Sequence, residues 1–242
     1  MADGTDKAVI HGWNTGISAA ITILFLLLLS CEQTSAQTFQ FLPEVDAYYK
    51  IQPDIQFNFQ AKETREAGEP TQGELGPSFN FLLKPLVRLK EVTLFDLDDA
   101  KSRPLLLSVG YRYVPTVGKP PTQRVEPVLT FHLPLTAKIL LSDRNRWDLD
   151  WSQGRFTWRY RNRPTLERRV RIRSYHPAPY VSSEFFYQSQ YHKWATTALY
   201  TGCLLPAGKH IQFDPYYEHQ NITGKRPNQQ LNQFGLVLNL YL

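Results

Sequence analysis

Apolar and polar side chains alternate along most of this chain, and turn-forming residues separate the alternating segments. The clearest case lies between residues 146 and 161. There Trp147, Leu149 and Trp151 alternate with charged residues, and aromatic and basic residues alternate again after Gln153-Gly154. Successive side chains of a strand point to opposite faces, so this pattern predicts two antiparallel strands joined by a tight turn.

A two-residue turn also predicts which residues of this hairpin face each other. On the aromatic face the predicted pairs are Trp151 with Phe156, Leu149 with Trp158, and Trp147 with Tyr160. On the charged face they are Asp148 with Arg159 and Arg146 with Arg161. A soluble sandwich would bury the aromatic face, whereas a transmembrane barrel would turn it to lipid and enclose the charges.

The same period of two recurs through most of the chain, and no convincing amphipathic helix interrupts it. The further alternating segments are residues 44–52, 54–60, 76–83, 105–113, 127–135, 181–187, 194–204, 211–220 and 234–242. These segments predict eleven or twelve strands, and we expect twelve because single-chain bacterial barrels have even strand numbers. Residues 153–154 and 206–209 are expected to form tight connections. Residues 61–74 and 114–124 are rich in Gly, Pro and charge and are expected to form long exposed loops.

The last segment favours a barrel over a sandwich. Its apolar face runs from Phe234 to Leu242 without a polar tail. A barrel closes by pairing such a strand with the first one, which removes the exposed sheet edges. Aromatic residues make up 13% of the chain and many lie near strand ends, where a membrane-interface girdle would place them. We therefore predict an all-β fold, an antiparallel transmembrane β-barrel of about twelve strands.

The N-terminal region contains the single strongly apolar run, residues 17–29, which is too short to span a bilayer as a helix. It fits a signal peptide, with the small residues Thr34-Ser35-Ala36 as a cleavage site. The predicted organisation is a signal peptide over 1–36 and an outer-membrane barrel domain over 37–242. Two alternatives stay open: lipidation at Cys31 after a lipoprotein-type box, and a single N-terminal anchor helix.

Composition narrows the partners of the chain. Cleavage after residue 36 would raise the formal net charge from +5 to +7 and leave one cysteine, Cys203, so no intramolecular disulfide could form. A basic pI of about 9.1 and arginines between aromatic residues raise the question of nucleic-acid binding. Export and the separation of these residues onto opposite faces argue against it. We expect a lipid bilayer and the outer-membrane assembly machinery as partners, and the oligomeric state stays open.

The polar faces of the predicted strands gather charged residues inside the barrel. The predicted interior cluster consists of Arg112, Arg144, Arg146, Asp148, Asp150, Arg155, Arg159, Arg161, Arg163, Glu184, Asp214 and Glu218. Charges away from water require partners, so one interpretation is a set of cross-strand ion pairs that fills a narrow barrel. The other is that surplus arginines form an anion-attracting lumen or ligand pocket.

No motif identifies an enzyme. The chain has no G-x-S-x-G, H-E-x-x-H, G-x-G-x-x-G or P-loop motif, and its histidines lack metal-ligand spacing. Arginines opposite Asp148 and Asp150 favour ionised carboxylates, which suit salt bridges better than proton donation. We therefore predict no catalytic, cofactor-binding or metal-binding residues. The predicted role is a narrow pore or a structural or ligand-binding membrane component. The alternatives are a barrel enzyme acting on lipid and an exported soluble β-domain that binds a small ligand.

Several short motifs resemble a bacterial family of proteins of unknown function, the domain-of-unknown-function 2490 family. They are Arg144-Asn145-Arg146, Trp158-Arg159-Tyr160-Arg161-Asn162-Arg163, Leu166-Glu167-Arg168, Pro179-Tyr180-Val181, Glu184-Phe185-Phe186 and Asp214-Pro215-Tyr216-Tyr217. The resemblance covers most of residues 39–242 and is densest after Leu135. It implies an outer-membrane β-barrel and no particular reaction. Leu242 departs from the terminal aromatic residue that is usual in such barrels.

Overall fold

The structure is a computed structural model that describes residues 37–83, 99–135, 139–224 and 228–242. Eleven strands lie within these ranges, together with two short 3-10 helices, η1 (Asp99–Ser102) and η2 (Ser189–Tyr191). The strands are β1 (Gln37–Gln52), β2 (Ile55–Glu66), β3 (Glu69–Leu83), β4 (Leu105–Thr116), β5 (Lys119–Pro134), β6 (Ile139–Ser152), β7 (Arg155–Arg168), β8 (Ala178–Gln188), β9 (Lys193–Pro206), β10 (Ile211–Ile222) and β11 (Gln229–Tyr241). No helix within the described ranges is long and apolar enough to cross a membrane. The signal peptide predicted over 1–36 lies outside the described residues.

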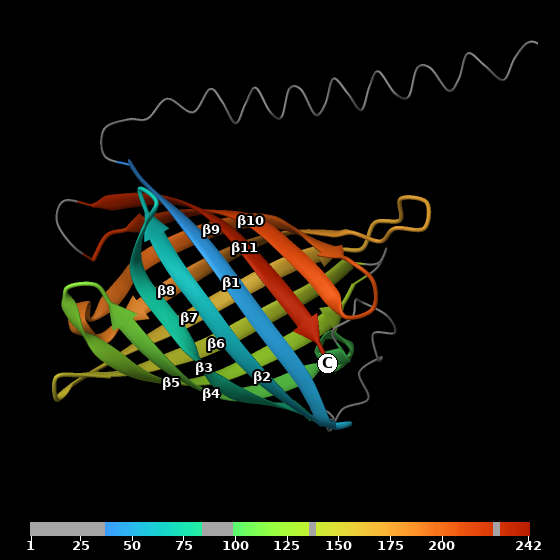
Figure 1. Cartoon of the computed structure of the whole chain (residues 1–242), viewed down its shortest axis with the longest axis horizontal. Coiled ribbons are helices and arrows are strands. Elements are labelled where there is room, and N and C mark those ends of the chain that lie inside the picture. The colour runs from blue at the N-terminus through green and yellow to red at the C-terminus, as the bar shows by residue number, and fades with distance from the viewer. Residues whose placement is uncertain (1–36, 84–98, 136–138, 225–227) are drawn as a thin grey trace, which may run out of the picture. The chain divides into compact units, whose positions relative to one another are not determined.

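The strands form one closed barrel in which each strand is hydrogen-bonded to its neighbours in sequence, and β11 returns to β1 (Figure 1). The consecutive pairs are antiparallel, as the alternating pattern predicted. The all-β barrel fold predicted from the sequence is therefore confirmed. Closure leaves no free sheet edge in the wall.

The closing pair differs from the others because β1 and β11 run in the same direction. The side-chain amides of Gln40 and Gln233 are hydrogen-bonded (2.5 Å), and eight residues further along β1 the Leu242 amide donates to the Tyr48 carbonyl (2.8 Å). Residue numbers thus increase in the same direction along both strands, as the two ribbons in Figure 1 show. The described residues contain eleven strands, one fewer than the twelve expected. An odd number of alternating strands requires one parallel pair.

The β6–β7 hairpin has the predicted register. Asp148 faces Arg159, Arg146 faces Arg161, and the aromatic pairs match the predicted ones. The ring centroids of Trp147 and Tyr160 lie 5.1 Å apart, and so do those of Trp151 and Phe156. Gln153 and Gly154 both have a left-handed backbone, with φ of 50° and 73°, which a tight hairpin turn of this kind requires.

The long loops expected at residues 61–74 and 114–124 are not present, and that prediction was wrong. Residues 61–66 continue β2, residues 69–74 begin β3, and the chain reverses at Ala67-Gly68. Likewise β4 and β5 are joined at Val117-Gly118. The Gly, Pro and charged residues that indicated loops belong to the ends of long strands.

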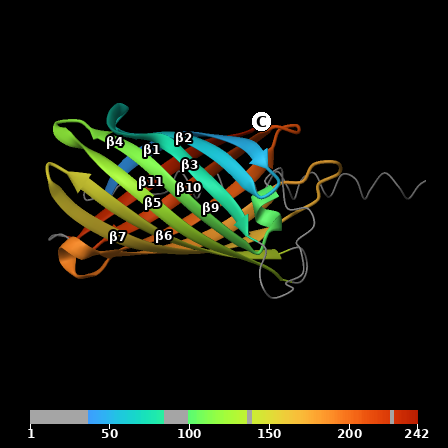
Figure 2. The same cartoon turned by 90° about the horizontal axis from the view of Figure 1, so that it is seen from below.

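The barrel has two rims, which we name by their connections. The turn rim carries the start of β1 and the reversals at residues 67–68, 117–118 and 153–154. The loop rim carries η1, residues 169–177 and the end of β11. Figure 2 shows η1 at this rim. Lys101 of η1 forms an ion pair with Glu167 of β7 (2.7 Å), and Glu167 is buried. This contact ties η1 to the inner wall.

Inner and outer faces differ in chemistry. Along β3, Ser78, Asn80 and Leu82 point inward and are buried, whereas Phe79 and Leu83 point outward and are 44% and 38% exposed. On the β8–β11 side the interior is filled by a cluster that includes Tyr180, Phe186, Tyr200 and Tyr216. The inner face is therefore polar on one side of the barrel and aromatic on the other.

Two inner glycines make room for the aromatic side. Gly235 lies opposite Tyr216, and a Cβ added to it would come within 2.0 Å of the Tyr216 ring. Gly202 lies opposite Tyr180, and its added Cβ would lie 2.6 Å from that ring. Each tyrosine thus lies flat over the backbone of the neighbouring strand, and its ring covers the glycine.

One outward-facing cluster is polar. Asn162 donates to Asp143 (2.7 Å) and to Asn145 (3.1 Å), and the Tyr160 hydroxyl donates to Asn145 (2.5 Å). Asn145 also donates to Asp143 (3.2 Å). These groups satisfy one another on a largely apolar surface, which lowers the free energy needed to keep them away from water.

Candidate functional site

The inner wall of β3 to β8 carries a continuous network of ion pairs. At its centre is Asp148, which has no exposed surface. Arg159 donates to Asp148 from Nε (2.8 Å) and Nη2 (2.5 Å), and Arg146 donates to the other oxygen of the same carboxylate. Arg161 lies 3.8 Å from Asp148. These arginines reach one carboxylate because β6 and β7 place residues of the same face at alternate positions.

Residues of β3, β4 and β5 extend this network around the barrel. Arg124 holds Asp150 with two hydrogen bonds of 2.6 and 3.2 Å and lies 3.3 Å from Glu74. Glu126 pairs with Arg146 and lies 3.6 Å from Arg112. Each of these carboxylates thus has at least one guanidinium partner, as buried charges require.

On the other side of Asp148 the network reaches β8 and β9. Arg161 donates two parallel hydrogen bonds of 2.8 and 2.9 Å to Glu184, the geometry in which a guanidinium binds a carboxylate most strongly. The Tyr200 hydroxyl donates to the same carboxylate (2.7 Å). The guanidinium of Arg161 also lies over the Phe186 ring at 4.5 Å. Here the ionic side of the interior meets the aromatic side.

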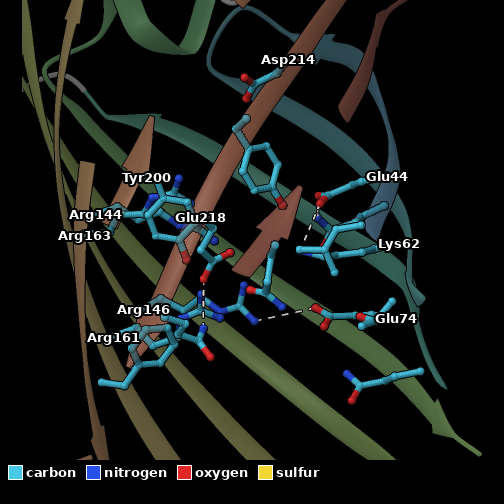
Figure 3. A pocket seen from close by; sticks show the side chains of 18 of the residues that line it. Glu44, Lys62, Glu74, Arg144, Arg146, Arg161, Arg163, Tyr200, Asp214 and Glu218 are labelled. Carbon is cyan, nitrogen blue, oxygen red and sulfur yellow. Dashed lines mark hydrogen bonds and ion pairs between the residues drawn. The ribbon is translucent and has the colours of Figure 1, made fainter. Parts of the chain in front are cut away.

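A cavity of about 330 Å³ lies between the two sides. Figure 3 shows the side chains that surround it, with Arg144 and Arg163 next to Tyr200 and the Glu44–Lys62 pair across the space. Arg163 stacks on the Tyr200 ring at 3.8 Å and donates to the Ser182 hydroxyl (3.1 Å). Most of the groups lining the cavity are polar, so it suits a hydrated or charged occupant rather than an apolar one.

The profile of a family described as "Protein of unknown function (DUF2490)" matches residues 100–231, more than half of the chain. The chain belongs to the DUF2490 family. The resemblance noted in its motifs is thereby confirmed. No match to a curated protein was found.

The DUF2490 match runs from η1 into β11 and contains most of the ionic network. Of the interior residues predicted from the sequence, eleven point inward from β4, β6, β7, β8 or β10. They are Arg112, Arg144, Arg146, Asp148, Asp150, Arg159, Arg161, Arg163, Glu184, Asp214 and Glu218. Arg155 lies beside the turn after β6 and is exposed, so the structure does not bring it into the network.

Several charged residues of the interior were missed by the sequence analysis, and four of them belong to the ion pairs of the inner wall. They are Lys62, Glu74, Arg124 and Glu126. Lys62, Glu74 and Arg124 belong to the segments taken for loops, and Glu126 lies just outside the segment predicted as a strand. The alternation of Arg124, Glu126 and Val128 with Val125 and Pro127 was the available signal.

The network is suited to keeping charged side chains in fixed positions rather than to transferring protons, because its carboxylates are surrounded by arginines. No group of three or more His, Cys, Asp or Glu residues in the described ranges is placed to hold a metal ion. What the site offers chemically is a set of fixed guanidinium and hydroxyl donors around a polar cavity. These are groups that bind anionic or strongly polar solutes.

Proposed function

We propose that this DUF2490 protein is an integral β-barrel of a bacterial outer membrane, with a narrow charged interior that binds a small solute. The observation that carries the proposal is the outer surface. Large apolar side chains point outward around the barrel and are exposed, among them Val109 (44% exposed), Val181 (57%) and Leu199 (62%). Lipid is the environment in which such a surface is stable.

The closed wall supports the same proposal. In hydrocarbon every backbone N–H and C=O group must be paired within the protein, and a closed barrel achieves this. The apolar run at residues 17–29 and the small residues that follow it fit export to the cell envelope. Assembly would then require the machinery that inserts outer-membrane barrels, and the bilayer would be the main partner of the mature chain.

The interior favours binding over free diffusion. Ion pairs connect β3 to β8 along the inner wall, and aromatic rings fill much of the opposite side. A barrel of this strand number is narrow even before its side chains are placed. We therefore assign the interior to a binding chamber or a tightly restricted pathway rather than to a wide channel.

The membrane assignment can be tested with one matched pair of substitutions in the β4–β5 hairpin. Val109 points outward within β4, whereas Val117 lies in the turn and is 71% exposed. If the outer face meets lipid, Val109→Arg should lower the free energy of unfolding in lipid vesicles by about 2–4 kcal/mol. Val117→Arg should change it by about 0–1 kcal/mol, because the turn lies near or beyond the membrane interface.

Folding of the two variants and the wild type is measured by urea titration in vesicles, alongside fractionation of cell membranes. Equal effects of the two substitutions would contradict the proposal, because a water-exposed outer face would tolerate arginine at both positions. Recovery of the wild type in the soluble fraction without detergent would contradict it as well.

A further inference from the structure

Two arginines of the interior have no acidic partner among the residues that the structure describes. Arg144 of β6 and Arg163 of β7 are directly opposite in the strand register and both point into the cavity (Figure 3). Among the described residues no carboxylate oxygen lies within 4.0 Å of either guanidinium, although fourteen ion pairs elsewhere in those ranges meet this limit. Like charges that face each other on adjacent strands destabilise a sheet.

The carboxylates around the same cavity already have donors. Glu184 is held by Arg161 and Tyr200, and Glu44 lies 3.4 Å from Lys62. Asp214 accepts a hydrogen bond from the Tyr180 hydroxyl (3.0 Å). Glu218 accepts one from the Gln220 amide (2.9 Å). Each of these carboxylates thus has at least one other donor, and none of them lies within 4.0 Å of the Arg144 or Arg163 guanidinium.

The remaining contacts of Arg163 fix its orientation without using all its donors. Its plane lies over the Tyr200 ring and its Nε donates to Ser182, so the two terminal nitrogens stay available toward the cavity. Tyr200 is itself fixed by its hydrogen bond to Glu184. The side chain of Arg144 makes no hydrogen bond or ion pair with any described residue, and it borders the cavity. One guanidinium fixed in orientation and a second one facing it provide the donors that an oxyanion accepts.

We propose that Arg144 and Arg163 form a binding site for a small oxyanion, a free phosphate or the phosphate or carboxylate group of a small solute. The bound anion would neutralise the facing pair and accept the hydrogen bonds that no protein group accepts. The closed wall separates this site from the outer face, so the ligand must enter from a rim as a solute and not as a lipid headgroup. The site rests on the proposed binding role and specifies the class of solute that is bound, but it does not depend on the membrane location.

The test uses the detergent-solubilised protein and inorganic phosphate as the probe, with binding followed by calorimetry in a buffer free of other oxyanions. The wild type should bind phosphate saturably. Arg144→Gln and Arg163→Gln should each weaken binding about tenfold or more, because each removes charge-assisted hydrogen bonds. Arg155→Gln is the matched control, since Arg155 is an exposed arginine beside the turn, and it should leave binding unchanged.

A second measurement separates binding from folding. Without phosphate, Arg144→Gln should unfold at the same temperature as the wild type or a higher one, because it removes a like-charge pair. Phosphate should then raise the melting temperature of the wild type alone. Three results would overturn the site: no saturable binding, equal binding by the Gln variants, or a marked loss of stability in Arg144→Gln without phosphate. Competition by phosphatidylglycerol added to the micelles would overturn the assignment to a free solute. None of these results bears on the test of Val109 and Val117.

Discussion

Asp148 is the residue on which the ionic side of the interior depends. It has no contact with water, and the guanidinium groups of Arg146 and Arg159 both bind it. Removing one member of such a buried set leaves the other charges unpaired in a region of low dielectric. The loss is therefore much larger than the net contribution of an exposed ion pair.

We predict that Asp148→Asn lowers the free energy of unfolding by about 3–5 kcal/mol, measured by urea denaturation in micelles. The control is Asp54→Asn at the loop rim, where the carboxylate is 48% exposed and lies 3.2 Å from Arg103. That change should lower stability by less than about 1 kcal/mol. Similar losses in the two variants would show that the buried arginines find other partners when Asp148 is neutral.

At the scale of single elements, the β6–β7 hairpin could be predicted from the sequence almost completely. Its two strands alternate without a break, and its two-residue turn leaves one register that puts all aromatic residues on one face. The segments at 61–74 and 114–124 could not be predicted in the same way. Strand ends that extend past an apolar belt have no requirement for apolar residues on either face, so their sequences resemble loops.

The same difficulty explains which parts of the interior site were missed. Lys62, Glu74 and Arg124 lie on those strand ends, and their pairing partners follow only from the three-dimensional register. Tyr200 belongs to a segment that was predicted as a strand, and Tyr180 lies one residue before another such segment. Their role beside the arginines depends on contacts between β8, β9 and β10, which periodicity along one strand does not reveal.

Strands β10 and β11 offer a test of how tyrosine packs over glycine. Gly235→Ala would place a methyl group where the Tyr216 ring lies, so the ring must move or the strands must separate. We predict a loss of about 1–3 kcal/mol in unfolding free energy, the usual range for an overpacked interior. In a Tyr216→Ala background the same change should have little effect, because the ring is absent. An unchanged loss in that background would contradict the packing argument.

At the scale of the whole molecule, the barrel combines an apolar exterior with an interior in which charge is largely matched. The sequence pointed to a surplus of arginine. The structure removes Arg155 from the interior, and the carboxylates of Glu44, Glu74, Glu126 and Glu167 outnumber the added cations Lys62 and Arg124. At the central cavity, Arg144 and Arg163 have no carboxylate within 4.0 Å among the described residues, and Asp214 and Glu218 accept hydrogen bonds from uncharged groups only. A narrow barrel with one such site is better suited to selecting a solute than to passing solutes freely.

The parallel β1–β11 pair has a consequence for the sides of a membrane. Within the described residues an odd number of strands runs from one rim of the barrel to the other, so Thr38 lies at the turn rim and Leu242 at the loop rim. If the barrel spans the outer membrane, an epitope inserted before Thr38 and one placed after Leu242 should be reached by antibody from opposite compartments. An epitope in the Gln153-Gly154 turn should share its side with Thr38. Detection of the Thr38 and Leu242 epitopes together on intact cells would instead mean an even number of crossings.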